Sequence, residues 1–313
     1  MATDRRCPVV ASWSIGSTGK LRCLEARTGR LVWESPLGPE TERFARLKAK
    51  CLADRQMPRC KMDFCSAPVV VDGVVVCGDN REGLLGIDAD TGRPIWGPVS
   101  ECINKASSPT CWESGGKAYV IAASRKAVCV EPKTGRVLWE VTDVANAGTV
   151  AVNDRYMVLS GGSANCNERV RTTTGMMCYR ITPQSAERAW ALDPEYCNHV
   201  TSPVIYQEHV YGFSNEATVC IELATGKVVA AVAFPGTRSC SSLGAADGRI
   251  LREHLYQRLY WYRADPRGFT QLGDPWRPPP HAENTTAAIA DGRLILRGKD
   301  GLYCYDLRKP EVR

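Results

Sequence analysis

Residues Thr28-Gly29-Arg30-Leu31-Val32-Trp33 form a phrase that recurs along the chain: Thr-Gly, a basic residue, two apolar residues and Trp. Two further full copies stand at residues 91–96 and 134–139. Residues 225–230 keep the Thr-Gly pair but end in Ala230, and residues 185–190 keep the Trp without the glycine. A phrase repeated at a fixed period predicts a repeat architecture, in which each copy belongs to one structural unit.

Each phrase follows a predicted strand with a shared residue pattern, and a hairpin precedes that strand. The hairpins place Asp-Gly between two β-rich runs, as at Asp72-Gly73 and Asp291-Gly292, which is typical of a tight two-residue turn. The shared strand pattern occurs in seven segments, at residues 22–26, 86–89, 129–132, 178–181, 220–223, 261–264 and 304–307. One unit therefore holds four short strands within about 40 residues. The sequence predicts an all-β fold, a β-propeller of about seven four-stranded blades.

The units resemble the pyrroloquinoline-quinone-like (PQQ-like) β-propeller repeat family, in which an Asp-Gly hairpin is followed by a strand, a Thr-Gly turn and a Trp. The resemblance covers residues 9–308. It implies that the Trp of each outer strand docks between blades. The family includes quinone-dependent alcohol dehydrogenases, an outer-membrane assembly lipoprotein and propellers of other roles. The resemblance therefore implies the fold and leaves the function open.

The whole chain, residues 1–313, is predicted to be a single PQQ-like propeller domain, because propellers grow by adding blades around an axis. Its two end units are short. The first begins mid-blade at residues 8–15, and the last stops after residues 304–307. An incomplete eight-bladed propeller is therefore the alternative to seven blades.

Composition restricts the partners and the compartment. No long apolar run occurs, so we expect no transmembrane segment. The net charge of +6 is spread along the chain and gives no nucleic-acid signal. The first residues carry no apolar leader, so we expect a cytoplasmic protein if the chain is complete. A periplasmic or extracellular location is expected instead if the natural N-terminus is missing.

Twelve of the 15 cysteines fall into two groups. Five share one position in the third strand of a unit, where the PQQ-like consensus has a small residue: Cys23, Cys129, Cys178, Cys220 and Cys304. A cysteine behaves as a small buried hydrophobe. We expect these five to be inert packing thiols between blades, too far apart for disulfides.

The second group lies in connections that a propeller places on one loop-rich face: Cys51, Cys60, Cys65, Cys102, Cys166, Cys197 and Cys240. Thiolates and imidazoles bind zinc or copper(I), so Cys65, Cys197, His199 and Cys240 are candidate metal ligands near the axial mouth. No Cys-x-x-Cys pair accompanies them. Disulfides such as Cys51–Cys60 or Cys102–Cys111 are one alternative, and unpaired thiols are the other.

Cys65 and Cys240 occupy equivalent positions, where the chain turns down into the central channel. The corresponding residues of the other units are Ala106, Asn146, Val200 and Asn284.

Two insertions break the period, and both are predicted to lie on the loop-rich face. In residues 39–63, apolar side chains such as Phe44 fall at helical spacing, which predicts a short amphipathic helix over the top of the propeller. Residues 161–175 are predicted to form a polar, glycine-bounded loop. The candidate partner-binding residues are Phe44, Arg46, Lys50, Arg169 and Arg171.

The sequence shows no catalytic constellation. The quinone dehydrogenases of the PQQ-like family usually carry an adjacent Cys-Cys pair, and this chain has none. Ser-His-Asp and phosphate-loop patterns are also missing. We therefore expect no catalytic residue, no cofactor and a protein partner, bound by a scaffolding propeller through its loop-rich face and axial mouth. The alternative is a redox propeller that binds a small molecule, a metal or a quinone such as PQQ at that mouth.

Overall fold

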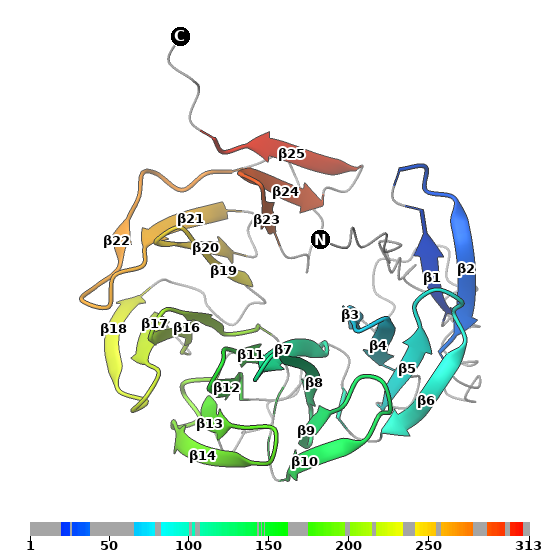
Figure 1. The fold of residues 1–313 in the computed structure, drawn as a ribbon. Coiled ribbons are helices and arrows are strands. Elements are labelled where there is room, and N and C mark those ends of the chain that lie inside the picture. Colours follow the sequence, from blue (N-terminus) through cyan, green and yellow to red (C-terminus); the bar gives the residue numbers. More distant parts are fainter. Residues whose placement is uncertain are drawn as a thin grey trace, which may run out of the picture.

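Successive antiparallel sheets surround a central axis in the computed structural model (Figure 1). The structure describes residues 20–25, 27–37, 66–78, 83–99, 102, 103, 107–142, 144, 146, 148–161, 175–197, 201–214, 217–233, 242–254, 258–277, 287–297 and 301–308. Every regular element within these ranges is a β-strand, which confirms the all-β prediction. No helix in this part of the chain has the length and apolar character needed to cross a bilayer.

Within the described ranges, twenty-five strands form seven sheets in sequence order. The first three sheets are β1 (Lys20–Leu24) with β2 (Leu31–Pro36); β3 (Val69–Val71), β4 (Val74–Gly78), β5 (Leu84–Asp88) and β6 (Pro94–Val99); and β7 (Thr110–Ser114), β8 (Lys117–Ala123), β9 (Ala127–Val130) and β10 (Val137–Val141). The next two are β11 (Ala151–Val152), β12 (Tyr156–Leu159), β13 (Met177–Ile181) and β14 (Ala186–Ala191); and β15 (Val204–Tyr206), β16 (His209–Phe213), β17 (Ala217–Glu222) and β18 (Val228–Ala233). The last two are β19 (Ser242–Ala246), β20 (Arg249–His254), β21 (Arg258–Arg263) and β22 (Thr270–Gln271); and β23 (Ala288–Ala290), β24 (Arg293–Arg297) and β25 (Leu302–Asp306).

The first strand of each four-stranded sheet lies nearest the axis, and the fourth lies on the outside (Figure 1). Consecutive inner strands contact one another, from β3 to β7, β11, β15 and β19. This radial arrangement is that of a β-propeller. The sheet β1–β2 and the sheet β23–β25 stand at the two ends of the series (Figure 1), and among the described residues no strand pairing joins them. The number of blades in a closed ring therefore stays a prediction.

The Asp-Gly hairpins form as the sequence predicts. Asp72 and Gly73 join β3 to β4 with φ of 51° and 79°, and Asp291 and Gly292 join β23 to β24 with φ of 48° and 68°. Two successive residues in the left-handed region make the turn whose twist matches that of the flanking strands.

Four tryptophans join consecutive sheets. The indole N–H of an outer-strand Trp donates a hydrogen bond to a turn carbonyl of the next sheet: Trp33 to Ala89 (2.9 Å), Trp96 to Pro132 (2.7 Å), Trp139 to Thr182 (2.9 Å) and Trp190 to Leu223 (2.8 Å). We call these four contacts the Trp joints. They confirm that the recurring Trp docks between blades, and they supply each buried indole with a partner.

The second of the two apolar residues before each Trp position forms an irregularity in the outer strand. In the outer strands β2, β6, β10, β14 and β18, the register slips by one residue just before the Trp position, so the second apolar residue forms a β-bulge. The bulge sets the Trp directly opposite a small residue of the third strand, as in Cys23 opposite Trp33 and Gly86 opposite Trp96. A Cβ on Gly86 would lie 2.1 Å from the Trp96 ring, so the pairing selects for a small side chain.

The Thr-Gly turn repeats one set of hydrogen bonds. In the third sheet, the Thr134 hydroxyl donates to Glu131 (2.6 Å), the N–H of Arg136 donates to that hydroxyl (3.2 Å), and the N–H of Gly135 donates to the Glu131 carbonyl (2.9 Å). The same bonds occur in the turns at residues 25–30, 88–93 and 222–227. Gly135 has φ of 70°, and its position against the Trp96 ring leaves no room for a Cβ. Glycine is therefore required twice over, by the backbone and by the docked ring.

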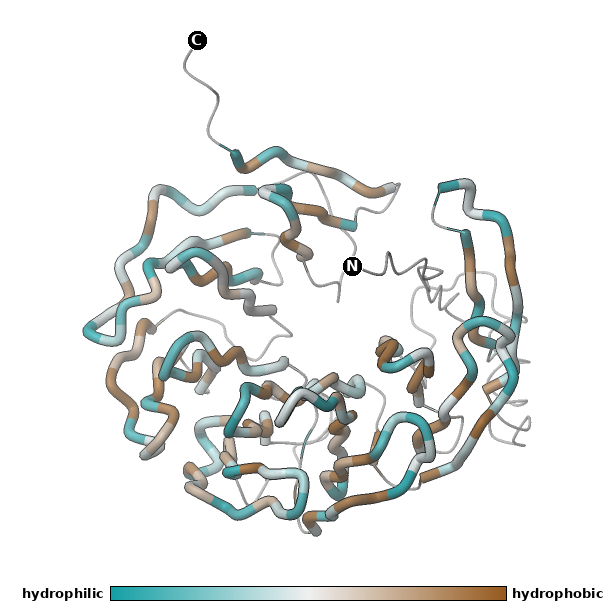
Figure 2. The backbone as a smooth tube through the Cα atoms, in the orientation of Figure 1, coloured by the Kyte–Doolittle hydropathy of each residue, from teal (hydrophilic) through white to brown (hydrophobic). Residues whose placement is uncertain are grey.

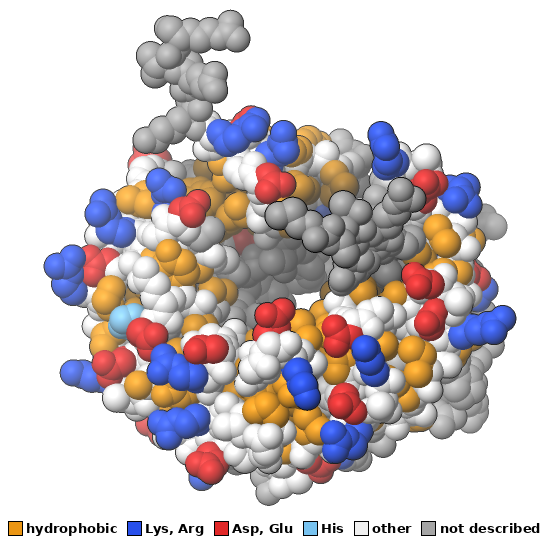
Figure 3. All heavy atoms as spheres, in the orientation of Figure 1, with side chains coloured by type: hydrophobic (Ala, Val, Ile, Leu, Met, Phe, Trp, Pro, Cys, Tyr) orange, Lys and Arg blue, Asp and Glu red, His pale blue; other side chains and the backbone are white. Residues whose placement is uncertain are grey.

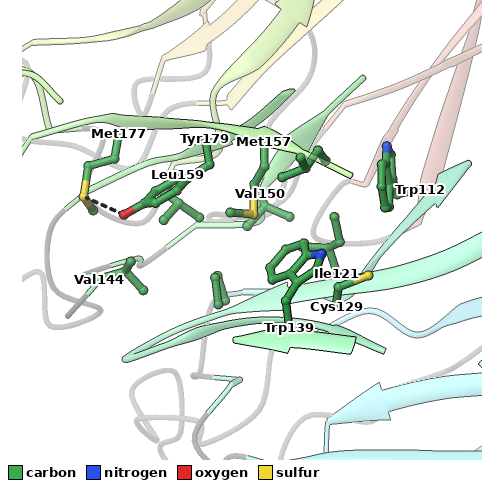
Figure 4. Packing of buried hydrophobic residues seen from close by; sticks show 13 residues of the cluster. Trp112, Ile121, Cys129, Trp139, Val144, Val150, Met157, Leu159, Met177 and Tyr179 are labelled. Carbon is green, nitrogen blue, oxygen red and sulfur yellow. Dashed lines mark hydrogen bonds between the residues drawn. The ribbon is translucent and has the colours of Figure 1, made fainter. Parts of the chain in front are cut away.

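Apolar side chains of adjacent sheets interlock between the Trp joints. Hydrophobic residues concentrate along the strands, whereas the turns are polar (Figure 2). Figure 4 shows one interface, where Ile121, Cys129 and Trp139 of the third sheet meet Met157 and Tyr179 of the fourth. Cys129 and its equivalents Cys23, Cys178 and Cys220 are completely buried, which confirms the prediction for these four packing thiols.

Cys304 is an exception, because it occupies the same repeat position but is exposed. The prediction that it is a buried packing thiol is wrong. The reason is local: no strand pairs with the outer edge of β25 among the described residues, and no sheet packs on that face.

Candidate functional site

The axial mouth on the loop-rich face is formed where the inner strands begin. A chain of hydrogen bonds links four consecutive sheets there. The Ala67 N–H donates to the Ser108 hydroxyl (2.9 Å), the Ser108 N–H to the Thr149 hydroxyl (3.1 Å), and the Thr149 N–H to the Ser202 hydroxyl (2.9 Å). We call this chain of hydrogen bonds, in which the hydroxyls of Ser108, Thr149 and Ser202 accept, the hydroxyl belt.

The hydroxyl belt supplies acceptors for backbone N–H groups near the inner strands. An inner strand is the edge of its sheet, so N–H groups on its open side lack a strand partner. A Ser or Thr at the start of the next inner strand offers an acceptor at the right place, because consecutive inner strands are in contact. The belt hydroxyls therefore hold one sheet to the next, and this accounts for them without any ligand.

A buried polar node fixes the connection into the fourth sheet. The amide nitrogen of Asn146 donates to the carbonyls of Ala123 (3.1 Å) and Gly148 (2.6 Å). Its amide oxygen accepts from the N–H (2.8 Å) and the hydroxyl (2.9 Å) of Ser160. Gly148 lies so close to the Thr201 carbonyl that a Cβ would approach it to 2.7 Å. A node this fully bonded is rigid and structural.

Asn146 is informative because it is the repeat equivalent of Cys65 and Cys240. Its side chain is 3% exposed and is engaged within the protein. Cys65 and Cys240 lie outside the described residues, so their place at the channel stays a prediction.

The structure places one of the four predicted metal ligands. Cys197 is buried just after the turn at residues 193–196, whose Tyr196 carbonyl accepts from the N–H of Met176 (2.8 Å). His199, Cys65 and Cys240 fall outside the described residues, as do all five predicted partner-binding residues, Phe44, Arg46, Lys50, Arg169 and Arg171. Within the described ranges, no group of three or more His, Cys, Asp or Glu side chains is placed to hold a metal ion.

The two insertions also fall largely outside the described residues. Residues 39–63 are not described, so the amphipathic helix stays a prediction. The glycines that bound the second insertion are described, and a Cβ on Gly161 would lie 2.4 Å from the Gly175 carbonyl oxygen. The two ends of that insertion therefore lie against each other.

The suggested Cys102–Cys111 disulfide is wrong. The Cys102 thiol donates to the Val99 carbonyl (3.2 Å), and Cys111 is an unoxidised thiol on β7. Both side chains belong to the apolar cluster between the second and third sheets, where they pack as small hydrophobes.

The face opposite the loop-rich face carries the Thr-Gly turns, and we call it the turn face. Its charges are mixed in sign. Figure 3 shows Lys and Arg side chains interspersed with Asp and Glu around the rim of this face. The basic residue of a Thr-Gly turn pairs with the carboxylate of the same turn, as Arg30 does with Glu25 (3.4 Å) and Arg136 with Glu131 (3.6 Å). Such exposed pairs contribute little to stability, and together they leave no field of one sign.

Sequence reasoning missed two buried charged residues on β20, Arg252 and Glu253. Arg252 on β20 is 1% exposed, and its guanidinium lies over the rings of Phe213 (5.8 Å) and Tyr260 (5.4 Å). Burial lowers the pKa of Arg252 to about 10, so the group remains charged at neutral pH. The sequence contains a feature that could have revealed this site. Residues 251–254 read Leu-Arg-Glu-His, where other units have apolar second strands. Arg252 therefore lies between the fifth and sixth sheets, because Phe213 belongs to β16 and Tyr260 to β21. At this interface β18 carries Ala230 in place of Trp.

The repeat, the Trp joints and the radial sheets can be compared with known proteins. A family model described as outer membrane protein assembly factor BamB matches residues 9–232. The chain belongs to this family. No curated protein matches the sequence significantly.

Solved structures agree with BamB-family membership at the level of the fold. BamB from Moraxella catarrhalis superposes with a TM-score of 0.63 at 14% identity, covering 92% of this chain and 76% of that one. The RRP9 WD40 repeats give 0.57 at 11% identity, covering 90% of this chain and 82% of theirs. The quinohemoprotein alcohol dehydrogenase ADHIIG from Pseudomonas putida HK5 gives 0.63 at 12% identity, covering 94% and 63% respectively. The shared feature is the β-propeller.

Proposed function

We propose that this BamB-family chain is a non-catalytic propeller that binds protein partners through its loop-rich face and axial mouth. One observation carries the proposal: at the mouth, the hydroxyls of Ser108, Thr149 and Ser202 and the side-chain amide of Asn146 are engaged in contacts within and between sheets. The hydroxyl belt and the Asn146 node are bonded to backbone and to each other, which leaves the connecting loops as the variable surface. A scaffold needs this combination of a rigid ring and variable loops.

The names of the similar proteins support the same class of function. The matched family is described as an assembly factor, and a structural neighbour consists of WD40 repeats. Phe44, Arg46 and Lys50 of the first insertion and Arg169 and Arg171 of the second are the proposed contacts. They combine an aromatic anchor with guanidinium groups, which are enriched at protein interfaces.

We also propose a periplasmic location. The family description names the outer membrane, whose inner surface is reached from the periplasm. In that oxidising compartment, loop cysteines such as Cys51 and Cys60 are candidates for a disulfide. Intact-mass measurement with and without reductant counts the disulfides. A fully reduced protein isolated from its native compartment contradicts the periplasmic location.

Photo-crosslinking in cells tests the binding face. A crosslinking amino acid is placed at Lys50 or Arg171 on the predicted face, and at Lys133 in an exposed Thr-Gly turn as the matched control. Antiparallel strand order puts turns of that kind at the opposite end of the sheets. Specific adducts from Lys50 and Arg171 and none from Lys133 support the proposal. Equal capture from both faces, or capture from the turn face alone, contradicts it.

The redox alternative is tested on the same purified protein. Its support is the likeness to a quinohemoprotein dehydrogenase, and at 12% identity that likeness concerns the fold. Elemental analysis and an absorption spectrum decide the question. A stoichiometric metal, or a visible band lost in the double variant Cys65→Ser and Cys240→Ser, overturns the non-catalytic function.

A further inference from the structure

The outer strand of the fifth sheet, β18, differs from every other outer strand that the structure describes. It lies on the rim of the ring (Figure 1), and its residues read Val-Val-Ala-Ala-Val-Ala. None of these residues is charged and none is a proline, and each is half-buried or exposed. Within the described ranges, β18 pairs only with β17, so its outer edge is open. The composition of an open edge decides whether it can pair with another strand.

The other outer strands are protected against such pairing. Proteins guard sheet edges with charged residues, with prolines or by keeping the edge strand short. The charged residues and prolines of these strands are Glu34 and Pro36 in β2, Pro94 and Pro98 in β6, Glu140 in β10, and Glu187 and Arg188 in β14. The strand β22 is only two residues long. Of the outer strands within the described ranges, β18 alone has none of these protections.

The open edge of β18 does not result from an incomplete sheet. The fifth sheet has its four strands in order from β15 to β18, and β18 holds the place of the fourth strand in the repeat. The repeat therefore supplies no further strand of the same chain at this edge. After a bulge at Val229, residues 230–233 form a regular ladder with β17. A regular antiparallel strand presents its outward N–H and C=O groups at the spacing that an added strand needs.

The sequence of β18 is suited to pairing with a second copy of itself. In an antiparallel pair related by a two-fold axis, the residue on the axis lies opposite its own copy. With Ala231 on the axis, Ala230 lies opposite Val232 of the second copy, and Val229 lies opposite its Ala233. Every pair is apolar, and two small alanines meet at the centre. The register therefore brings no charged or bulky side chain into the contact.

The charge next to β18 also agrees with pairing between two copies. Lys227 directly precedes the strand and is exposed. In the register centred on Ala231, the two copies of Lys227 stand about 26 Å apart, at a rise of about 3.3 Å per residue. Like charges are thus kept apart, and an uncharged partner strand is present on every copy of the chain. The contact is short, so we expect a weak dimer that depends on concentration.

We propose that β18 is a self-association edge, through which two copies of this chain join their fifth sheets into one continuous antiparallel sheet. The two-fold axis passes at Ala231, so the same strand is used on both copies and the assembly closes at a dimer. Backbone hydrogen bonds supply the attachment, as in other cases of strand addition to an open edge. The edge lies on the rim, so the dimer presents the loop-rich face twice.

Sedimentation velocity of the full chain, from about 1 µM to about 300 µM, tests for the weak dimer. We expect a reversible shift from monomer to dimer as the concentration rises. Ala231→Lys should abolish this shift, because it sets two like charges directly opposite each other. Ala189→Lys adds the same charge at an exposed alanine of β14 and should dimerise as the unmodified chain does. A dimer that persists in Ala231→Lys, or a chain that stays monomeric throughout, overturns the proposal.

Hydrogen exchange on the unmodified chain locates the contact without a variant. The outward amides of β18 should exchange about tenfold more slowly when the free protein is at about ten times the dimer Kd than in dilute solution. The amides of β14 should exchange at the same rate in both samples. Slow exchange in β18 that does not change with concentration means that the same chain covers the edge, and it overturns the proposal. Monomeric protein can still give the loop-face crosslinks described above, so the two proposals fail separately.

Discussion

The joints between sheets are built in two ways, and the boundary lies at the fifth sheet. From β1 to β18, each joint repeats one device, a Trp indole bonded to a turn carbonyl of the next sheet. Between β18 and β25, the described residues contain no such Trp bond. Arg252 lies between two aromatic rings at one of the later joints, and Trp276 packs edge-on against Tyr305, with ring centroids 4.6 Å apart, at the other.

The turns also differ between the two regions. The later sheets replace the Thr-Gly turn by an Asp-x-Arg turn, in which Arg267 pairs with Asp265 (2.9 Å) and Arg308 pairs with Asp306. In three of the four Thr-Gly turns, the Trp ring of the preceding sheet lies against the turn glycine. Trp139 forms its joint on the turn at residues 182–185, which has no glycine, so a Trp joint does not require a Thr-Gly turn.

The largest effect is expected where a Trp joint is removed. Trp139→Ala deletes a side chain that is 8% exposed and removes the indole donor of the Thr182 carbonyl, which keeps only the longer bond from the Ser185 N–H (3.4 Å). We expect a loss of about 3–5 kcal/mol in the free energy of unfolding, measured by equilibrium urea denaturation. Trp276→Ala, in the later joints, should lose about 1–2 kcal/mol because Trp276 is only half-buried. Equal losses would mean that the two kinds of joint are equivalent.

Two glycines allow the effect of the docked Trp ring to be measured separately from that of the backbone conformation. Gly135 and Gly29 hold the same position in two different Thr-Gly turns, with nearly the same φ, 70° and 71°. A Cβ on Gly135 would lie 2.4 Å from the Trp96 ring, whereas a Cβ on Gly29 meets nothing within 4 Å. We expect Gly29→Ala to cost about 1–2 kcal/mol from the backbone alone. Gly135→Ala should cost about 1–3 kcal/mol more from the clash, in the same urea assay. A difference of zero would show that the ring moves aside freely.

The sequence was sufficient for the repeated part of the fold because repetition averages out local exceptions. Thr134, Gly135 and Trp139 each have a physical reason to recur, and their spacing encodes the turn, the bulge and the joint in that order. The prediction failed at Cys304 because a repeat position implies burial only if neighbours exist on both sides. It missed Arg252 because a charge within a strand normally indicates an exposed face.

The candidate site was less predictable for a related reason. The loops of the predicted site carry no repeat, so periodicity gives them no structure, and Cys65, His199 and Cys240 are outside the described residues. Asn146 shows the difficulty. It shares a sequence position with Cys65 and Cys240, and its role as the centre of a polar node depends on Ser160, which no spacing rule connects to it.

A smaller effect concerns the buried packing thiols of the first five sheets. Burial raises the pKa of Cys129 and of Cys178 to about 12 and that of Cys220 to about 11. An acid whose pKa is raised by folding destabilises the fold once the unfolded chain ionises. The stability is therefore complete below about pH 9 and falls as the pH rises toward about 12. We expect about 1 kcal/mol of loss per thiol at about pH 10, measured by urea denaturation. Cys129→Ala should flatten this dependence, and an unchanged slope would contradict the assignment.

The smallest effect concerns the turns. The Thr134 hydroxyl is the main cause of the lowered pKa of Glu131, and the Arg267 side chain is the main cause of the pKa of about 2 at Asp265. A carboxylate with a lowered pKa stabilises the fold above its ordinary pKa, and this contribution is lost as the pH falls through the folded value. Thr134→Val should raise the pKa of Glu131 toward its ordinary value, and Arg267→Gln should do the same for Asp265, as read by NMR titration. If Thr134→Val left the pKa of Glu131 unchanged, the hydroxyl would serve only the Arg136 N–H, and the recurrence of Thr in these turns would rest on the backbone alone.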